Sequence, residues 1–555
     1  MSADPRDELV FLPLGGSNEI GMNLNAYGFG PADARKWIVV DVGVTFGDST
    51  TPGVDVIVPD PTYLEGEDIL GIVLTHAHED HIGALGWLWP RLKAPLYATP
   101  FTAFLIREKL RDAGLLDEVE LNVVPLGGTI QLGDFEVTMV TITHSIPEPN
   151  GLAIKTPLGT VLHTGDWKID EDPVIGERTD VETIRRLGDE GVLAMVCDST
   201  NVFVDGSAGS EAEVKVALTT LIGSLTGKVA VGCFASNVAR LDSVIRAAEA
   251  CGRRVCLVGR SMHRITAAAR SVGLLKDVQP FIDMSEAGYF PDEAILYLCT
   301  GSQGEPRAAL SRIANGDHPH ISLGKGDACI FSSRQIPGNE LAIGRMQDKL
   351  AERGVRLYTE RDHPGIHVSG HPCRDELREM YQWARPRIAV PTHGQRRHLI
   401  EHCNLARDMQ VPEAVALRNG DLLRLAPGLA EIIDEVPSGR LFVDGGILTP
   451  EGSEALKERR HAAVAGVIAV AVAIDGKGRL AGDLEIRSLG LPGDDELEEA
   501  LDELAGLAAE ALARLKPAER QDDLTVEQAV ARAVKRAARQ IWDRKPAVET
   551  LIVRI

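Results

Sequence analysis

A dense group of side chains that commonly bind metals lies near residue 80. Three histidines and one aspartate occupy six consecutive positions in the pattern H-x-H-x-D-H. These side chains are His76, His78, Asp80 and His81. Imidazole and carboxylate together suit zinc or manganese. The apolar run 69–74 before the motif predicts a buried strand, and the small residues at 82–86 predict the start of a helix. A strand that ends where a helix begins holds its ligands rigidly, so we expect a metal site here.

Further ligand-type side chains follow other predicted strands. His144 follows the β-branched run 137–143, Asp166 follows the strand predicted at 159–163, and His393 follows the apolar run 388–390. A histidine at the end of a strand is by itself usually an ordinary polar residue. The motif near residue 80 cannot complete two metal sites alone, however. The order in which these three residues follow the motif therefore makes the combination informative.

This order of residues resembles the metallo-β-lactamase fold. The resemblance implies an α/β fold, a four-layer αβ/βα sandwich, that holds two divalent metal ions, with zinc expected and manganese as the alternative. One ion would be bound by His76, His78 and His144, and the other by Asp80, His81 and His393, with Asp166 bridging both. Two cations about 3.5–4 Å apart activate water near neutral pH and stabilise both oxygens of a phosphodiester displacement.

A long insertion separates Asp166 from His393. More than two hundred residues lie between them, whereas simpler members of the fold reach their last histidine soon after the bridging aspartate. This insertion is typical of the β-CASP nucleases. Asp198 resembles the first β-CASP motif, His367 and His371 in H-V-S-G-H resemble the second, and His393 is the third. Relatives that process DNA tend to carry valine at the third position, so His393 favours RNA as the substrate.

Several segments resemble bacterial ribonuclease J specifically. They are residues 15–23, 234–237, 259–262, 300–306 and 336–340, and the resemblance is dense over residues 9–445. It implies a ribonuclease that acts as a 5′-to-3′ exonuclease, preferring 5′-monophosphate ends, and as an endonuclease, in mRNA decay and rRNA maturation. A homodimer or homotetramer is expected, with single-stranded RNA as substrate and proteins of an RNA-degradation complex as further partners.

The resemblance also assigns roles to individual side chains. The expected catalytic residues are Asp80, Asp198, His367 and His371. Asp198 and His371 are candidates for the acid/base pair that moves protons at attack and at the leaving 3′-oxygen, while His367 is expected to orient the site or to donate instead. RNA-backbone contacts are expected from the turn Ser236–Asn237 and from the loop His367, Val368, Ser369, Gly370 and His371. Small residues in such loops let backbone N–H groups approach a phosphate closely.

The expected architecture is a metallo-β-lactamase sandwich with an inserted β-CASP α/β domain and a small C-terminal α/β domain. The predicted boundaries are 1–205 for the first part of the metallo-β-lactamase domain and 206–362 for the β-CASP domain. Residues 363–450 are predicted to complete the first domain with histidine-bearing loops and short strands. Residues 451–555 are predicted as a linker and C-terminal domain, with the linker centred on 437–460.

The last hundred residues show helical periodicity instead of further ligands. Apolar residues recur at helical spacing from Leu497 to Leu515, which predicts a helix whose apolar stripe belongs to a core. Thr525 with Gln528 predicts a capping box for a second helix that ends near Asp543. The apolar run 462–474 predicts a core strand, and residues 549–555 predict a final one.

Composition narrows the class of protein without naming a substrate. A chain of 555 residues is long enough for several domains, and no apolar run is long enough to span a membrane. The polar N-terminus has no signal core, and the eight scattered cysteines form no C-x-x-C pair. A cytoplasmic protein with reduced thiols is therefore expected. The net charge of −23 argues against a basic nucleic-acid domain, but bound cations or a basic cleft can attract phosphate locally.

Two other functions remain open at this point. A small-molecule metallohydrolase of the same fold would use the same ligands, although the long insertion and the H-V-S-G-H loop argue against it. A non-catalytic RNA-binding scaffold is the second alternative, and the complete set of seven ligand residues argues against that one.

Overall fold

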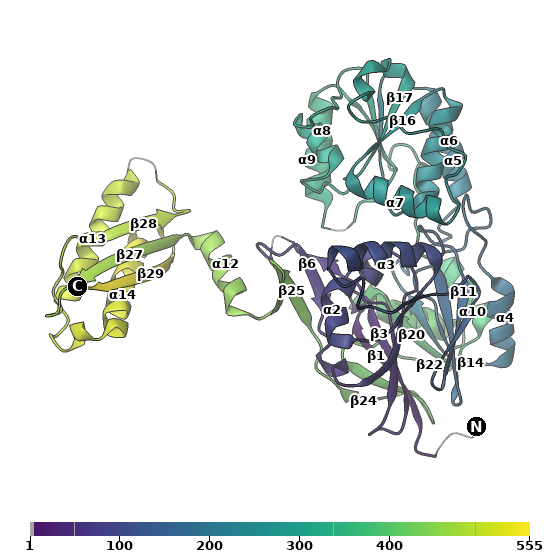
Figure 1. The fold of residues 1–555 in the computed structure, drawn as a ribbon, viewed down its shortest axis with the longest axis horizontal. Helices are drawn as coiled ribbons and strands as arrows, with labels where there is room; N and C mark the ends of the chain where they lie inside the picture. The colour runs from purple at the N-terminus through teal and green to yellow at the C-terminus, as the bar shows by residue number, and fades with distance from the viewer. Residues whose placement is uncertain (1–4, 49, 337, 494–495) are drawn as a thin grey trace. The chain divides into compact units, whose positions relative to one another are not determined.

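The computed structural model describes residues 5–48, 50–336, 338–493 and 496–555. The chain divides into two compact units: one comprises the residues up to 45 together with 58–440, and the other comprises 46–57 and 441–555. Figure 1 shows the chain coloured from purple at the N-terminus to yellow at the C-terminus. Both units combine helices with β-sheets, as the predicted fold class requires.

The first unit contains two large sheets that form a sandwich. The eight-stranded sheet runs in the order β24-β23-β1-β3-β4-β7-β8-β9. Its strands are β1 (Glu8–Gly15), β3 (Leu24–Gly30), β4 (Lys36–Val40), β7 (Asp68–Val73), β8 (Leu96–Ala98), β9 (Leu121–Val123), β23 (Asp421–Ala426) and β24 (Glu431–Glu435). The seven-stranded sheet runs β10-β11-β12-β13-β14-β20-β22. Its strands are β10 (Thr129–Leu132), β11 (Phe135–Thr141), β12 (Asn150–Thr156), β13 (Gly159–His163), β14 (Val192–Asp198), β20 (Ile388–Thr392) and β22 (Glu413–Ala414).

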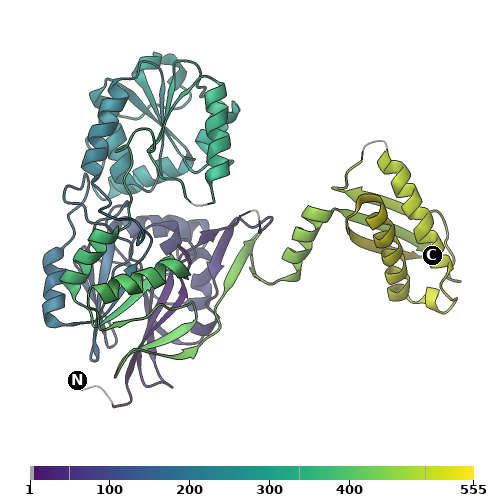
Figure 2. The same cartoon turned by 180° about the vertical axis from the view of Figure 1, so that it is seen from behind.

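Apolar side chains from both sheets share one core. Phe11 and Val73 of the first sheet lie in the same buried cluster as Phe135, Val161 and Val390 of the second. Burial of this continuous apolar surface is the main force that holds the two sheets together. Helices cover the outer faces (Figure 2). They are α2 (Leu85–Leu92) and α3 (Pro100–Asp112) for the first sheet, and α4 (Val181–Glu190), α10 (Arg374–Ala384) and α11 (Arg396–Asp408) for the second.

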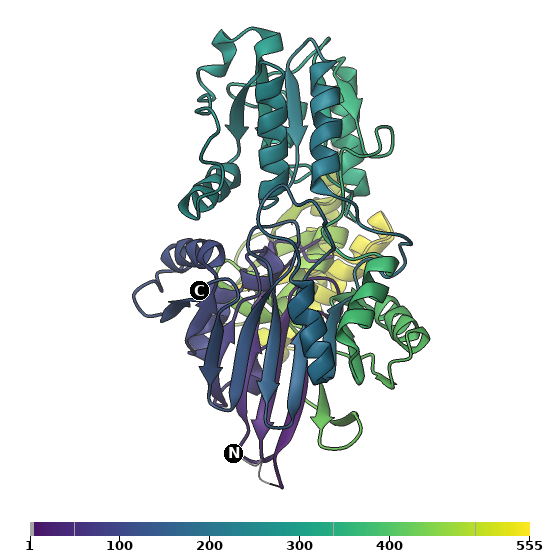
Figure 3. The ribbon, with the colours of Figure 1, turned by 90° about the vertical axis from the view of Figure 1, so that its right-hand side faces the viewer.

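A parallel five-stranded sheet is inserted between β14 and β20. Its order is β16-β17-β15-β18-β19. The strands are β15 (Val229–Gly232), β16 (Arg254–Val258), β17 (Ile295–Cys299), β18 (Ala328–Phe331) and β19 (Arg356–Tyr358). The helices α5 (Glu211–Gly223), α6 (Val238–Ala250), α7 (Arg260–Ser271), α8 (Ala309–Asn315) and α9 (Glu340–Glu352) flank it on both sides (Figure 1). In Figure 3 this segment, coloured teal, is drawn above the purple and blue strands of the sandwich.

The second unit has its own core around a three-stranded sheet. The order is β28-β27-β29, formed by β27 (Val467–Ile474), β28 (Glu485–Leu489) and β29 (Ala547–Arg554). Alternate residues of β27, such as Ile468 and Val470, are buried against α13 (Glu496–Ala513) and α14 (Asp523–Trp542). The predicted apolar stripe of α13, including Leu504, therefore belongs to a core.

Three local predictions were wrong, and one was incomplete. Residues 437–460 contain the hairpin β25 (Arg440–Asp444) and β26 (Ile447–Pro450) and the start of α12 (Glu454–Ala465) instead of a simple linker. The predicted strand 462–474 begins only at Val467, because its alanines prolong α12. Asp522, and not Thr525, caps α14 by accepting a hydrogen bond from the Thr525 N–H. The incomplete prediction concerns residues 363–450, which contain the predicted loops and short strands and also the helices α10 and α11.

Two broader expectations from composition can be compared with the structure. All eight cysteines are free thiols. Within the described residues, no helix combines the length and the apolar character that a bilayer crossing requires. The domain boundaries near residues 205, 362 and 450 stay predictions.

Candidate metal centre

The H-x-H-x-D-H motif lies where β7 meets a short helix, as its strand–helix context predicted. The helix begins earlier than expected, because α1 (Glu79–Ile82) starts inside the motif and α2 follows from Leu85. His78 has extended backbone angles immediately before α1. Glu79 and Asp80 occupy the first turn of the helix, where its dipole favours negative charge. The motif therefore presents side chains both from an extended segment and from a helix.

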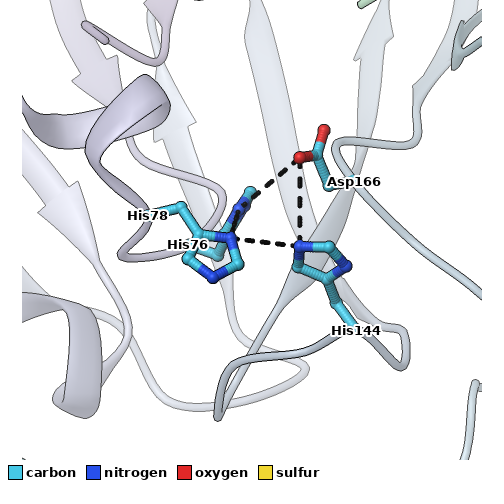
Figure 4. A group of neighbouring side chains, drawn as sticks. All are labelled: His76, His78, His144 and Asp166. Carbon is cyan, nitrogen blue, oxygen red and sulfur yellow. Dashed lines mark hydrogen bonds and ion pairs between the residues drawn. The ribbon is translucent and has the colours of Figure 1, made fainter. Parts of the chain in front are cut away.

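Three histidines and Asp166 form the first ligand group (Figure 4). His76 Nε2 lies 3.0 Å and His144 Nε2 lies 3.1 Å from His78 Nδ1. Asp166 Oδ2 lies 3.9 Å from the Nε2 atoms of both His76 and His144. The side chains come from two sheets and the loops at their ends, and their donor atoms converge on one point.

The protonation of this group suits a metal ligand set. Burial lowers the pKa of His76 and His144 well below the usual value for histidine, and the neighbouring histidines add to the effect. Burial also lowers the pKa of His78 to about 4. All three rings are therefore neutral near pH 7, which is the form in which imidazole binds metals. Each neutral ring has one nitrogen atom without a proton, and three such atoms close together can bind one shared cation.

Asp80, His81, His393 and Asp166 form the second ligand group. Asp80 Oδ2 lies 3.6 Å from His81 Nε2 and 3.5 Å from His393 Nε2. Asp166 Oδ2 lies 3.2 Å from His81 Nε2, while its Oδ1 lies 2.6 Å from His393 Nδ1. Asp166 therefore belongs to both groups. These positions agree with the ligand sets that the sequence predicts, whose metal-binding roles stay predictions.

His393 is an unusual member of this group. Its Nε2 is buried and has no hydrogen-bond partner among the residues that the structure describes, and its backbone φ of 50° lies in the left-handed region. Such a conformation is uncommon for a residue other than glycine and is often retained at functional sites. A buried nitrogen atom without a partner, 3.5 Å from the Asp80 carboxylate, fits a position beside a cation.

Charge affects the second group differently from the first. Burial disfavours the charged form of His81 and His393, but the nearby carboxylates outweigh burial and raise the pKa of both residues. The same attraction holds the pKa of Asp166 well below its usual value, against the opposing effect of burial. The carboxylates thus stabilise positive charge at this point, which also favours a divalent cation.

Outer partners hold several of these rings in place. Asp41 Oδ2 lies 2.7 Å from His81 Nδ1, and the Asp41 carboxylate also accepts hydrogen bonds from the N–H and hydroxyl of Thr75. Thr75 Oγ1 lies 3.0 Å from His76 Nδ1. Carboxylates and hydroxyls at this distance from a metal ligand orient its ring and tune its basicity. Neither Asp41 nor Thr75 was identified from the sequence.

The H-V-S-G-H loop contacts the metal centre through its backbone. The Gly370 carbonyl oxygen accepts a hydrogen bond from His144 Nδ1 at 2.5 Å. A Cβ atom at Gly370 would lie 2.7 Å from Ser145 Oγ and 2.9 Å from His144 Cε1. Glycine is therefore required for this close approach. The loop predicted to bind RNA thus also orients a candidate metal ligand.

Asp198 and His371 form a pair beside the ligand groups, in which Asp198 is buried and His371 is partly exposed. His371 Nδ1 lies 2.7 Å from Asp198 Oδ2 and 3.9 Å from Asp166 Oδ2. Burial alone would lower the pKa of His371, but the charge and hydrogen bond of Asp198 raise it to about 9. The other Asp198 oxygen accepts hydrogen bonds from the N–H and hydroxyl of Thr200. Asp198 therefore holds His371 in a fixed orientation with a proton available.

The remaining predicted residues lie apart from the ligand groups. His367 contacts the buried guanidinium of Arg240. Ser236 is partly exposed, whereas Asn237 is buried as the N-cap of α6, where it accepts from the Arg240 N–H and donates to Glu211. Val368 and Ser369 are partly exposed, and Ser369 Oγ accepts a hydrogen bond from Asn201 Nδ2.

Two functional candidates, Asp41 and Arg240, were not found from the sequence. Asp41 and Arg240 carry no motif, and each acts on a predicted residue from a distant part of the chain. Asp41 directly follows β4, so its place at the end of a strand was the one signal that could have identified it. No comparable signal marks Arg240.

Family models match most of the chain. Residues 26–190 match the metallo-beta-lactamase superfamily, and residues 226–350 match the ribonuclease J beta-CASP domain. Residues 363–415 match the Zn-dependent metallo-hydrolase RNA specificity domain. Residues 454–555 match the ribonuclease J C-terminal domain. The predicted fold class is confirmed by these matches.

Individual relatives lead to the same family. Ribonuclease J of Sinorhizobium meliloti is 45% identical over 552 residues, covering 99% of this chain and 98% of the relative. Ribonuclease J of Mycolicibacterium smegmatis is 39% identical, with 98% and 96% covered. A solved structure of a protein of unknown function from Enterococcus faecalis aligns with a TM-score of 0.53 at 16% identity, covering 75% of this chain and all of that one, and supports the fold alone. With this identity over nearly its whole length and an Asp/His cluster suited to divalent metals, the chain belongs to the ribonuclease J family of metal-dependent ribonucleases.

Proposed function

We propose that this ribonuclease hydrolyses RNA phosphodiesters with two divalent metal ions, zinc or alternatively manganese. The observation that carries this proposal is the convergence of two ligand groups on one shared carboxylate, Asp166. His76, His78 and His144 would complete one site, and Asp80, His81 and His393 the other. When bound, two such cations supply an activated water and stabilise the charge that develops on the phosphate.

The Asp198–His371 pair would supply proton transfer. The raised pKa of His371, about 9, keeps a proton on the ring near pH 7. Because Asp198 occupies Nδ1, the proton on Nε2 remains for donation to the leaving 3′-oxygen. General acid catalysis of this kind contributes roughly 10²–10⁴-fold to a rate. Asp80, at the edge of the second ligand group, would assist by holding its cation.

The loop 367–371 and the turn at Ser236 would contact the RNA backbone. The loop residues are partly exposed and lie next to His144 through Gly370. Ser236 is partly exposed immediately before the N-terminus of α6, where the helix dipole favours anions. The Asn237 side chain has two protein partners, so Ser236 is the better candidate for direct contact. A pocket here for one terminal phosphate would give 5′-to-3′ exonuclease action with a preference for 5′-monophosphate ends.

The wider role follows from family membership. We propose that the enzyme also cuts RNA internally and that it acts in mRNA decay and rRNA maturation in the cytoplasm. It would work as a homodimer or homotetramer, together with other proteins of an RNA-degradation complex. Measuring the molar mass of the full chain by light scattering tests the oligomer, since a monomer at working concentration contradicts it.

One assay separates these activities. RNA labelled at an internal position and carrying a 5′-monophosphate or a 5′-triphosphate is incubated with the metal-loaded enzyme, with and without chelator. We expect mononucleotides to form faster from the monophosphate substrate, internal fragments from both substrates, and neither product with chelator. Equal rates for the two ends would contradict the terminal pocket, and full activity in chelator would contradict the metal mechanism.

A further inference from the structure

Arg240 is a fully buried arginine near the start of α6. Its Nε and Nη2 donate to the two carboxylate oxygens of Glu211 at 3.0 and 2.9 Å. Its Nη1 donates to the backbone oxygen and hydroxyl of Ser332 at 2.8 and 2.7 Å, and to His367 Nδ1 at 3.1 Å. This side chain therefore links α5, α6 and the end of β18 to the loop that carries His367.

The direction of the bond to His367 determines the state of its ring. A guanidinium group has N–H donors and no acceptor. His367 Nδ1 must therefore accept, and it cannot carry a proton. A neutral imidazole with an accepting Nδ1 holds its one proton on Nε2. The contact thus selects one tautomer and leaves Nε2–H as the ring's donor.

The surrounding charges oppose a second proton on the ring. Burial lowers the pKa of His367 well below its usual value, and the positive charges of Arg240, Arg334 and Lys168 lower it further. A backbone hydrogen bond with Ser332 acts in the opposite direction but does not outweigh them. The facing carboxylates are already committed. Glu211 binds Arg240 through both oxygens, and Asp170 pairs with Lys168 at 2.9 Å. His367 therefore has no free carboxylate partner among the described residues that contact it.

The loop is held against this cluster from a second side. The Glu211 N–H donates to Asp170 Oδ2 at 3.0 Å, and the Lys168 ammonium donates to the Gly209 carbonyl oxygen at 3.0 Å. A Cβ at Gly209 would lie 3.0 Å from Val368 Cγ1, so the residue after His367 packs directly on this turn. His367 and the following residues up to His371 are partly exposed, so this loop is accessible to a ligand.

We propose that Arg240 is a positioning residue that fixes His367 as a neutral Nε2–H donor to an RNA phosphate. Recognition by this loop then does not change with pH over the neutral range. His367 is in consequence a binding residue and takes no part in proton transfer, which is left to His371. This inference rests on the proposed function, because it takes RNA to contact the loop 367–371.

The ring state can be measured without RNA. The full chain, labelled with ¹⁵N-histidine and loaded with metal, is studied by NMR, and the His367 signals are assigned by their loss in His367→Gln. We expect one Nε2–H tautomer and no titration between pH 5.5 and 8. A His367 ring that titrates near pH 6.5, or that populates both tautomers, would overturn the proposal whether or not the loop binds RNA.

Removing the charges of Arg240 and Glu211 together tests whether the state of His367 affects RNA binding. Arg240→Met with Glu211→Gln leaves no lone buried charge, and Arg246→Met, on the same helix but paired with Asp242 and Glu249, is the matched control. In the double variant we expect His367 to titrate and KM for RNA to rise about tenfold at pH 8, the worth of one charge-assisted hydrogen bond. The value of kcat should stay within about twofold, because proton transfer belongs to His371.

The pH dependence distinguishes positioning from general damage. At pH 6, the KM of the double variant for RNA should come closer to that of the wild type, because a charged His367 again donates to phosphate. A rise in KM that is the same at pH 6 and pH 8 would overturn the proposal. If the double variant does not fold, Arg240→Lys replaces it, because one ammonium cannot serve Glu211, Ser332 and His367 together. A locked ring in the wild type together with an unchanged KM in His367→Gln would instead refute the RNA contact of the proposed function.

Discussion

Two buried polar clusters in the first unit contrast sharply. In the candidate metal centre, the Nε2 atoms of His76 and His144 lie 3.0 and 3.1 Å from His78 Nδ1, and His393 Nε2 has no hydrogen-bond partner among the described residues. In the Arg240 cluster, each guanidinium nitrogen donates to a protein acceptor, and both oxygens of Glu211 are bonded. The metal centre has more hydrogen-bond acceptors than donors, whereas donors and acceptors are matched in the Arg240 cluster.

A binding site and a structural support differ in how their buried polar groups are compensated. Buried polar groups are stable when their hydrogen bonds and charges are compensated. The Arg240 cluster is compensated by the protein, so its role is to hold its neighbours. The three histidines of the first ligand group and His393 Nε2 lack such compensation from the described residues, and their donor types suit divalent cations.

The largest expected effect comes from removing the shared ligand. Asp166→Asn keeps the shape of the side chain but removes the negative charge that both groups use. We expect RNA cleavage to fall by more than about 100-fold, beyond the loss usual for an outer partner of a metal ligand, together with bound metal. Cleavage rates and metal analysis of the purified variant measure this. The exposed Asp189→Asn is the control, and wild-type cleavage by Asp166→Asn would refute the shared-ligand assignment.

The Arg240 cluster should respond through stability and not through metal content. Arg240→Met leaves Glu211 buried without a partner, and breaking a buried pair in this way costs about 3–5 kcal/mol. Adding Glu211→Gln should restore most of that loss. Urea unfolding of the three proteins gives the free energies. Equal stability of the single and double variants would show that the two charges do not depend on each other.

A smaller effect is expected from the outer partner of His81. Asp41→Asn keeps a hydrogen bond to the ring but loses the carboxylate charge. Metal affinity should fall by about 10–100-fold, which is typical for such partners. Competition with a chelating dye measures this affinity. An unchanged metal affinity would mean that Asp41 stabilises the fold through Thr75 and does not influence the metal site.

Exposed ion pairs provide the lower limit of the comparison. Arg385 and Asp189 lie 2.6 Å apart, but both side chains are more than half exposed. Solvent screens such a pair, so Asp189→Asn should change the free energy of unfolding by about 0–1 kcal/mol. Urea unfolding tests this, and a loss as large as that of Arg240→Met would remove burial as the distinguishing factor.

Much of the metal centre could be predicted because its residues occupy characteristic places. Ligand side chains at strand ends leave a local trace, and His144, Asp166 and His393 each follow an apolar or β-branched run. A family resemblance then orders these residues into two groups. Asp41 has the same kind of position but no neighbouring histidine in sequence, so nothing separated it from an ordinary surface aspartate.

Other features depend on contacts that sequence patterns do not record. The Gly370 carbonyl and the Arg240 guanidinium act across more than a hundred residues. In the second unit, local patterns were ambiguous. Thr525 and Asp522 are both good capping residues, and the backbone decided for Asp522. The alanines before Val467 fit either a strand or a helix, and their helix propensity prevailed.

The pairing of β14 with β20 has a consequence for how this enzyme can vary. The two strands are adjacent and parallel, and Asp198 at the end of β14 faces Thr392, the residue before His393. The inserted segment is therefore one long connection between two neighbouring strands of the sandwich. Its length and content can change over evolution while Asp198 and His393 keep their spacing. The sandwich holds the candidate ligands in place, and the excursion between these strands can vary without moving them.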